Sequence, residues 1–424
     1  MRIVRSLVAM GAVAATATAL AVAPALADPV NSHFRAITPQ PYDVVGVGSA
    51  TTQNMVNALS VAYNKTVKHH NSTHPFILSW DATPPHNPNL LTQQIRTKAG
   101  CPKNLRPDGS SAGIKALGTA GTVKFRGKTY PCVNFARSSR AFSATSGDPV
   151  FGPGGVSFTI LAKDAVTYAT TANSNVPNNL TTAQLSEIFG CQIPAKTYPL
   201  PGGGTVSFPE GTWGALLGPN AKNANGSPAP VLPQAGSGTL AFWAGDLGVA
   251  TTEPTCGPAV SLPTTKDPEE NEGIDNIFRV GDVASGKPNP DVIYPFSIGS
   301  YIAQQFHSPK PGKKPGKGQN HFGNDFRGVL HLNELNGTQP TATAGSGKSK
   351  HVTINPKFSA AFQRFVYNVV PFSTDKTHIP ASLEKWFDPA NVKGAPHGFF
   401  CEKGQNSIIE DYGFLPTPLC GLTS

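Results

Sequence analysis

Three short turns of glycine and hydroxyl residues are the parts of this sequence best suited to chemistry. Residues 236–239 read Gly-Ser-Gly-Thr and run directly into the apolar stretch Leu-Ala-Phe-Trp, and similar turns lie at 48–52 and 109–113. Each turn opens a predicted helix. The first turn of a helix leaves backbone N–H groups without partners and carries the positive end of the helix dipole, so it attracts anions, and hydroxyl groups add further donors. Three such turns predict a site that holds an oxyanion from several sides.

A purely structural use of the same residues stays open. Serine and threonine at helix starts are common N-caps, each worth about 1 kcal/mol. Thr51, Ser110 and Ser237 all stand at such positions. The two uses overlap, because N–H groups that a cap satisfies are the same groups that would bind a ligand.

The elements that must position these turns alternate between strand and helix, which predicts an α/β fold. The run at 156–170 is apolar and β-branched, as expected of a core strand. Thr181 and Gln184 have the spacing of a capping box. We expect residues 194–230, rich in Gly, Pro and Asn, to be mostly loop. The remaining elements follow from hydrophobic periodicity: strands at 43–47, 76–80 and 130–136, and helices at 51–69, from 114, at 181–189 and at 358–369.

The N-terminus has the pattern of a secretory signal. Arg2 and Arg5 precede an apolar segment rich in Ala and Val, and residues 25–27 read Ala-Leu-Ala, an A-x-A cleavage site. No Cys follows for lipid attachment, and no later apolar run approaches membrane-spanning length. We expect cleavage after Ala27 and a soluble monomer, secreted or periplasmic. The chain then left is long enough for two domains.

Composition and charge favour a loop-rich globular protein with anionic partners. Charged residues make up 14% of the chain, hydrophobic residues 39%, and there are 43 Gly and 40 Pro. The formal charge is +9, which favours anionic ligands or an anionic cell wall, although solubility alone also accounts for it. Six Cys without a C-x-x-C motif indicate three disulfides in an exported chain. We favour the sequential pairing that keeps each loop local: Cys101–Cys132, Cys191–Cys256 and Cys401–Cys420.

Taken in order, the motifs resemble those of the phosphate-specific type II periplasmic (solute-binding) proteins of ABC transporters. The cradle of that family reads Asp-Gly-Ser-Gly-Thr, and a second turn reads Gly-Ser-Ser-Gly-Gly-Val-Lys. The similar segments here are Thr51-Thr52, 109–115 (Gly-Ser-Ser-Ala-Gly-Ile-Lys), the strand end at 134–139, the helix at 180–190, the cradle at 235–239 and the returning strand at 294–301.

The resemblance implies a two-lobe type II fold with a hinge and an interlobe cleft. It implies a signal peptide at 1–27, a first part of lobe 1 at 28–154, lobe 2 at 155–292, and a second part of lobe 1 at 293–424, with a basic loop at 308–319 and a C-terminal tail. Phosphate or a related oxyanion would be captured by hinge closure, without covalent chemistry or a cofactor, and passed to an ABC permease. The implied ligand-binding residues are Thr51, Thr52, Ser110, Ser139, Ser237, Gly238 and Thr239.

The sequence departs from the family at three positions of the site. Ser139 and Ala235 stand where the family has Asp, and Pro233 stands where it has Arg. Arg140, or less directly Arg137, would restore the missing positive charge, because guanidinium groups suit bidentate oxyanion contacts. The other interpretation is that both arginines solvate a strand end at the surface. The departures also keep open a non-transport binding or adhesion protein that retains the fold and has lost the anion site.

A serine hydrolase is a further alternative. Residues 109–113 fit G-x-S-x-G, which would make Ser111 a nucleophile with Asp291 and His351 as candidate partners. That motif needs a strand directly before it, and 103–108 is a poor strand.

Other binding chemistry is not favoured. Residues 342–349 resemble a phosphate-binding P-loop but lack its strand and helix, so we expect a flexible loop. His69, His70 and His74 lack further ligands at metal-site spacing, and we expect no metal. The basic run at 310–317 has no interleaved aromatics, so we expect no nucleic acid partner.

Overall fold

The computed structural model describes most of the chain after the predicted signal segment. The described residues are 28–33, 35–85, 92–149, 152–252, 256, 269–270, 289–310, 313, 324–347, 350–374, 378–388 and 398–423. The predicted signal peptide at 1–27 and most of the basic loop at 308–319 lie outside them.

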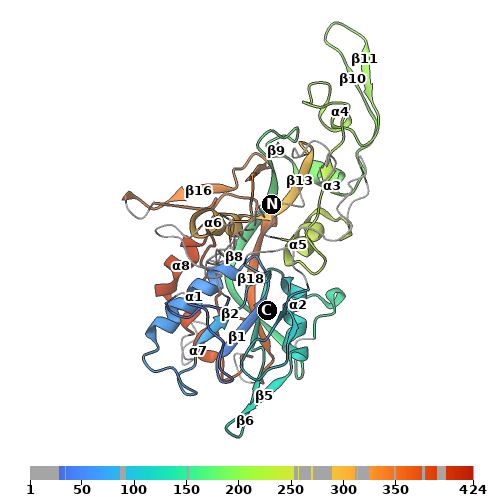
Figure 1. Cartoon of the computed structure of the whole chain (residues 1–424). Helices are drawn as coiled ribbons and strands as arrows, with labels where there is room; N and C mark the ends of the chain where they lie inside the picture. The colour runs from blue at the N-terminus through green and yellow to red at the C-terminus, as the bar shows by residue number, and fades with distance from the viewer. Residues whose placement is uncertain are drawn as a thin grey trace, which may run out of the picture.

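The fold is α/β and is built around an eight-stranded mixed sheet (Figure 1). The strand order is β12-β13-β8-β18-β7-β1-β2, and β14 pairs with β8. Neighbours β1, β2 and β7 are parallel, whereas β8 and β18 are antiparallel to each other. The strands are β1 (Val44–Gly48), β2 (Ile77–Ser79), β7 (Phe135–Ser138), β8 (Val156–Thr171), β12 (Ala229–Pro230), β13 (Val292–Ser297), β14 (Leu330–Leu332) and β18 (Gln363–Pro371).

Strands β8 and β18 connect two lobes. Residues 156–165 of β8 pair with β18, and β18 pairs on its other side with β7. Residues 166–171 of β8 pair with β13 and β14. Figure 1 accordingly shows β1, β2 and α2 toward one end of the molecule and β13, α3 and α4 toward the other. The helices are α1 (Gln53–Thr66), α2 (Gly109–Thr119), α3 (Thr182–Phe189), α4 (Trp213–Leu217), α5 (Gly238–Leu247), α6 (Ile298–His307), α7 (Glu384–Phe387) and α8 (Asn406–Asp411).

Each lobe has its own main hydrophobic core. In the first lobe, Met55 and Leu59 of α1 pack with Phe135 and Trp386. The second core contains the α5 residues Leu240, Trp243 and Leu247 together with side chains of α3, α4 and α6. The part of the chain after residue 293 contributes buried side chains to both cores. The predicted lobe boundaries at 154/155 and 292/293 therefore stay predictions.

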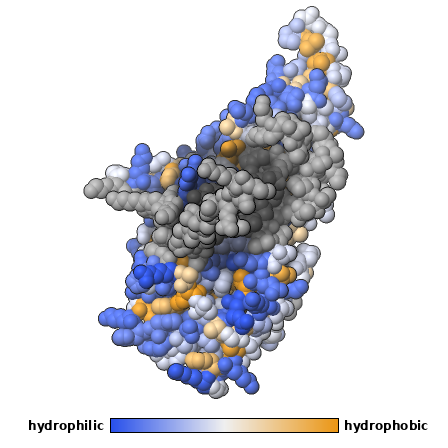
Figure 2. Space-filling view, viewed as in Figure 1, coloured by the Kyte–Doolittle hydropathy of each residue, from blue (hydrophilic) through white to orange (hydrophobic). Residues whose placement is uncertain are grey.

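Among the described residues, five two-stranded ribbons lie outside the main sheet. The hairpins β5–β6 and β10–β11 project from opposite ends of the molecule (Figure 1). In the view of Figure 2 the coloured surface is largely hydrophilic, and its apolar residues form small groups. The pairs are β3 (Gln94–Ile95) with β4 (Asn104–Leu105), β5 (Thr122–Phe125) with β6 (Lys128–Pro131), β9 (Asn179–Leu180) with β15 (Glu334–Leu335), β10 (Lys196–Pro199) with β11 (Thr205–Phe208), and β16 (Thr341–Ala344) with β17 (His351–Ile354).

Most predicted elements are confirmed, and two expectations are corrected. The capping box of α3 forms as predicted between Thr181 and Gln184. The helix predicted at 358–369 is wrong: a short 3-10 turn at Ala360–Phe362 leads into strand β18. Its β-branched and aromatic residues pack between β7 and β8, so tertiary pairing overrides the apparent helical period. The strand predicted at 130–136 is two strands, β6 and β7.

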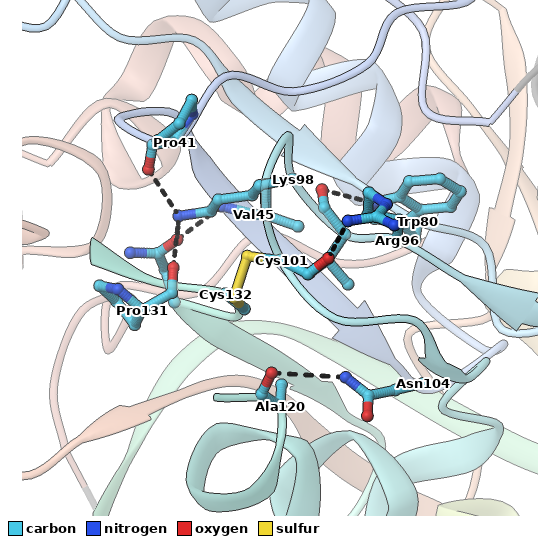
Figure 3. The surroundings of a disulfide bond; sticks show 12 residues. Pro41, Val45, Trp80, Arg96, Lys98, Cys101, Asn104, Ala120, Pro131 and Cys132 are labelled. Carbon is cyan, nitrogen blue, oxygen red and sulfur yellow. Dashed lines mark hydrogen bonds between the residues drawn. A yellow bond between two sulfur atoms is a disulfide. The ribbon is translucent and has the colours of Figure 1, made fainter. Parts of the chain in front are cut away.

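The predicted disulfide pairing is confirmed for all three bonds. Figure 3 shows the Cys101–Cys132 bond with Lys98 beside it. The buried Lys98 ammonium donates to the carbonyl of Pro131 at 2.6 Å and to Oδ1 of Asn134 at 2.7 Å. Asn134 also accepts from the N–H of Val45, so this polar cluster ties the disulfide loop to β1.

No helix in the described part of the chain is long and apolar enough to cross a membrane.

Candidate anion site

The turns predicted to form the site do converge. The turn at 48–52 leads into α1 of the first lobe, and the turn at 236–239 leads into α5 of the second. Ser139 follows β7, and Ser110 lies in the first turn of α2. All eight candidate residues are buried: Thr51, Thr52, Ser110, Ser139, Arg140, Ser237, Gly238 and Thr239. Their roles in ligand binding stay predictions.

A carboxylate of the chain itself occupies the centre of this arrangement. Glu270 is completely buried. Its Oε1 accepts hydrogen bonds from the Ser49 hydroxyl at 2.6 Å, the Thr51 N–H at 2.9 Å and the Thr51 hydroxyl at 3.0 Å. Its Oε2 accepts from the Ser237 hydroxyl at 2.6 Å and, over a longer 3.4 Å, from the Thr239 N–H. The hydroxyl and amide donors predicted for an oxyanion therefore surround an anionic group.

The two carboxylate oxygens are held by different lobes. The donors to Oε1 come from the turn before α1, and those to Oε2 come from the start of α5. Each turn presents the positive end of a helix dipole. An anion between two such ends is stabilised by both, whereas the ends alone would repel each other. Glu270 thus bridges the two lobes electrostatically.

The site keeps the Glu270 carboxyl ionised. Burial alone would raise its pKa, but hydrogen bonds from Ser237, Ser49 and the Thr51 N–H, with a further contribution from Arg364, hold the pKa below the usual 4.5. The occupant of the cradle at neutral pH is therefore an anion.

Ser110 and Ser139 form a second row of hydroxyls behind the carboxylate. The Ser139 N–H donates to the Ser110 hydroxyl at 3.1 Å, and the hydroxyl oxygens of Ser139 and Ser49 lie 3.1 Å apart. Gly238 lets α5 approach this row closely. A Cβ at position 238 would lie 2.3 Å from the Ser139 Oγ and 2.6 Å from the Ser110 Oγ.

A buried guanidinium lies next to the cradle. Arg364 of β18 donates from Nε and Nη2 to Oδ2 of Asp164 at 3.1 and 2.8 Å. Its Nη2 also donates to the Thr239 hydroxyl at 2.9 Å. Asp164 is itself fixed, because its Oδ1 accepts from the Ser297 hydroxyl and the Gly299 N–H. Nη1 of Arg364 is buried and has no hydrogen-bond partner among the described residues.

The two arginines singled out in the sequence are buried, so the interpretation that they solvate a strand end is wrong. Arg137 supports the first cradle turn: it donates from Nε to the Ser49 carbonyl at 3.0 Å and from Nη2 to the Gly48 carbonyl at 2.7 Å. Arg140 donates from Nη1 and Nη2 to the two carboxylate oxygens of Asp148 at 2.5 and 2.8 Å. A contact of Arg140 with a ligand stays a prediction.

The N-cap interpretation is borne out for Ser237 and is wrong for Thr51 and Ser110. The N-cap positions of α1 and α2 are Thr52 and Asp108, and neither side chain makes a capping hydrogen bond. The Ser237 hydroxyl accepts from the N–H groups of Thr239 and Leu240, and it also donates to Glu270. It therefore has both roles. Thr52 precedes α1 without capping it, and its buried hydroxyl has no partner within the described ranges.

Sequence reasoning missed three residues of the site: Ser49, Glu270 and Arg364. Ser49 lies inside a turn that the sequence did single out. Glu270 belongs to the acidic segment Asp-Pro-Glu-Glu-Asn-Glu at 267–272, which stands out in a basic chain. Nothing local indicates that this carboxylate reaches a turn more than two hundred positions away. Arg364 lies within the helix predicted at 358–369, and that prediction does not put its side chain on a central strand.

The geometry does not favour the hydrolase alternative. Ser111 accepts a hydrogen bond from Nη2 of Arg140 at 2.9 Å, whereas a nucleophile needs a base that accepts its proton. The motif needs a strand directly before it, but β4 ends at Leu105 and residues 106–108 separate it from α2. Asp291, a candidate partner of Ser111, accepts a hydrogen bond from Nε1 of Trp213. His351 begins β17, which pairs antiparallel with β16. Residues 342–344, which we expected to be a flexible loop, lie in β16, so they lack the strand-to-helix context of a P-loop.

Within the described residues there is no group of three or more His, Cys, Asp or Glu side chains that could hold a metal ion. His70 instead pairs with Asp43 at 2.6 Å and stacks on Phe76.

A scan against models of known protein families finds no match, and a search of curated proteins also finds none. Among solved structures, the chain is similar to an ABC-type phosphate transport receptor from Vibrio cholerae, with 14% identity over 88% of this chain and 99% of that chain and a TM-score of 0.43. It is also similar to PstS from Borrelia burgdorferi (16% identity, 88% and 98% covered, TM-score 0.38) and to a phosphate-binding protein from Stenotrophomonas maltophilia (13%, 88% and 90%, TM-score 0.37). Because these TM-scores are below 0.5, the fold described above rests on the chain's own strand order and cores.

Proposed function

We propose that this chain is an exported binding protein that holds a small oxyanion of the phosphate class between the starts of α1 and α5. One observation carries the proposal: donors from both lobes converge on a single buried anionic group, the Glu270 carboxylate. A soluble oxyanion that took the same place would meet hydroxyls and N–H groups from both lobes, as a hinge-closing binding protein requires.

The phosphate class follows from the sequence resemblance and fits the donor chemistry. The hydroxyls of Ser49, Thr51 and Ser237 donate to a fully ionised oxygen. Those of Ser49 and Thr51 can also accept a hydrogen bond from a proton still carried by hydrogen phosphate, whereas Ser237 already accepts from two backbone N–H groups. Binding and release then need no covalent step, so the chain is a carrier that passes its ligand to a membrane permease and is not an enzyme.

Calorimetric titration of the chain from residue 28 onward, stripped of phosphate, tests the proposal. We expect heat of binding with phosphate, and a weaker response with sulfate or a phosphate monoester. Ser237→Ala should raise the phosphate Kd about tenfold or more, since it removes a hydrogen bond to a charged group. Thr181→Ala removes an N-cap in the same lobe and should leave the Kd unchanged. Equal Kd values for Ser237→Ala and the parent would contradict the proposal.

A second candidate is a non-transport binding or adhesion protein in which the anion site no longer takes a ligand. The observation in its favour is also Glu270, because an internal carboxylate already satisfies the cradle. This candidate predicts that no anion binds, even when Glu270 is removed.

A further inference from the structure

We propose that Glu270 is the built-in ligand of the cradle and determines its affinity and selectivity, because a soluble oxyanion binds only by displacing this carboxylate. The inference rests on the proposed function and assigns a role to a residue outside the predicted site.

The hydroxyls that face Glu270 donate to its carboxylate. Each hydroxyl has a single hydrogen. The hydrogens of Thr51 and Ser237 point to Glu270 oxygens at 3.0 and 2.6 Å, and the Ser49 hydroxyl lies 2.6 Å from Oε1. A second anion in the cradle would find these donors occupied.

Charge adds to this exclusion. Two negative charges that share one buried site repel each other. Glu270 is completely buried, so water does not screen that repulsion. The carboxylate and a soluble oxyanion therefore occupy the cradle in turn and not together.

Competition of this kind raises the observed Kd. The apparent Kd equals the intrinsic value divided by the fraction of molecules whose cradle is free. If Glu270 holds the cradle in ten molecules of every eleven, its removal lowers the phosphate Kd about tenfold. Selectivity follows from the same balance, because only an anion with stronger contacts than a carboxylate displaces Glu270.

The test compares the phosphate Kd of the parent chain with those of Glu270→Ala and Glu270→Gln. Gln keeps the size of the side chain and removes its charge, so it separates charge competition from loss of packing. Glu210→Ala removes the same charge from an exposed position and serves as the control. We expect both Glu270 variants to bind phosphate at least about tenfold more tightly, and the control to match the parent.

The outcomes separate this inference from the proposed function. Equal or weaker phosphate binding by both Glu270 variants overturns the inference, while phosphate binding by the parent keeps the proposed function. If neither the parent nor the variants bind phosphate or sulfate, although all unfold cooperatively, the proposed function fails and this inference fails with it.

A different observation supports a second inference: we infer that Arg364 orients the cradle hydroxyls so that they donate to an anion. The Thr51 hydrogen goes to Glu270, so between Thr51 and Thr239, whose hydroxyl oxygens lie 3.3 Å apart, Thr239 is the donor. Thr239 in turn accepts from Nη2 of Arg364. The chain of hydrogen bonds therefore runs from the guanidinium to the anion in one direction.

Because these hydrogen bonds all run from Arg364 toward the anion, Arg364 is a positioning residue whose charge is held in one place. Asp164 holds Nε and Nη2, so the guanidinium keeps its orientation whether or not the cradle is filled. The residue is only 6% exposed, and its Nη1 is a buried donor without a hydrogen-bond partner in the described part of the chain. A lysine at this position keeps the charge but loses the paired geometry.

Arg364→Lys in the Glu270→Ala background tests this role. We expect the phosphate Kd to rise about tenfold, since a hydrogen bond to a charged group is worth about 1.5 to 3 kcal/mol. The matched control is Arg327→Lys, which alters another Arg–Asp pair, with Asp325. A merely structural role would lower stability in both variants and leave both Kd values at that of the Glu270→Ala chain. That result would overturn the inference.

Discussion

Ser237 caps α5 and also donates to Glu270: its hydroxyl accepts from two backbone N–H groups of the helix and gives its own hydrogen to the carboxylate at 2.6 Å. One side chain therefore couples the stability of a helix start to the charge in the cradle.

Ser237→Ala should cost more stability than an ordinary cap removal. Loss of an N-cap costs about 1 kcal/mol, and loss of a hydrogen bond to a charged group costs about 1.5 to 3 kcal/mol. Thr181→Ala, which removes the cap of α3, should show the first cost alone. Urea unfolding of both variants in phosphate-free buffer measures the difference. Equal losses would mean that the Ser237–Glu270 bond contributes nothing to stability.

Acidification should remove the stability that Glu270 provides. Its pKa in the folded chain lies below the usual 4.5 because hydrogen bonds from Ser237, Ser49 and Thr51 outweigh the effect of burial. A lowered carboxyl pKa contributes stability that is fully present above 4.5 and is lost as the pH falls through the folded-state value. The parent should be more stable than Glu270→Gln at pH 7, and the gap should narrow below pH 4.5. Unfolding free energies measured across this range check it, and a gap that stays constant to pH 3 or so contradicts it.

The disulfides should stabilise the chain in the order of their loop lengths. The pairs enclose separations of 19 residues for Cys401–Cys420 and 65 for Cys191–Cys256. The chain-entropy relation gives about 3 kcal/mol for the shorter loop and about 4 kcal/mol for the longer one. Double Cys→Ala variants of each pair, compared by urea unfolding, measure the two values. A larger loss of unfolding free energy for the short loop would show that native-state contacts at the C-terminal tail, and not loop length, determine the stability that this disulfide provides.

The sequence predicted the donors of the site better than its occupant. Turn chemistry at Thr51 and Ser237 is local, since glycine and hydroxyl residues before a helix favour free N–H groups wherever they occur. The position of Glu270 is a tertiary property, because it depends on how a distant acidic segment packs against both lobes. The alternation of predicted strands and helices indicated an α/β fold. Strand β18 was not predicted, because its conformation depends on pairing with a neighbouring strand on each side, and no local stretch of sequence contains those neighbours.

Arg140 shows the same limit. Its residue type and its place after a strand suggested an anion contact, but Asp148 is bound to both of its terminal nitrogens. Arg140→Met should lower stability by about 3 to 5 kcal/mol, because it leaves a buried carboxylate uncompensated. The double variant Arg140→Met with Asp148→Asn should recover most of that loss. A titration of the double variant with phosphate then tests the predicted ligand contact directly: a Kd raised about tenfold supports it, and an unchanged Kd limits Arg140 to a structural role.

Two glycines of α5 should respond in opposite ways to the same substitution. A Cβ at Gly238 would lie 2.3 and 2.6 Å from the hydroxyl oxygens of Ser139 and Ser110, closer than real contacts allow, so α5 must shift away from the cradle. Gly238→Ala should therefore destabilise the chain and weaken phosphate binding, because the N–H of Thr239 moves with the helix. Gly245 lies in the same helix with nothing within 4 Å of its added Cβ. Gly245→Ala should stabilise the chain by up to about 1 kcal/mol through helix propensity and leave the phosphate Kd unchanged. Thermal unfolding of both variants measures the change in stability, and titration with phosphate measures the change in Kd. If Gly238→Ala bound phosphate as tightly as Gly245→Ala, the close approach of α5 to Ser110 and Ser139 would have no part in forming the site.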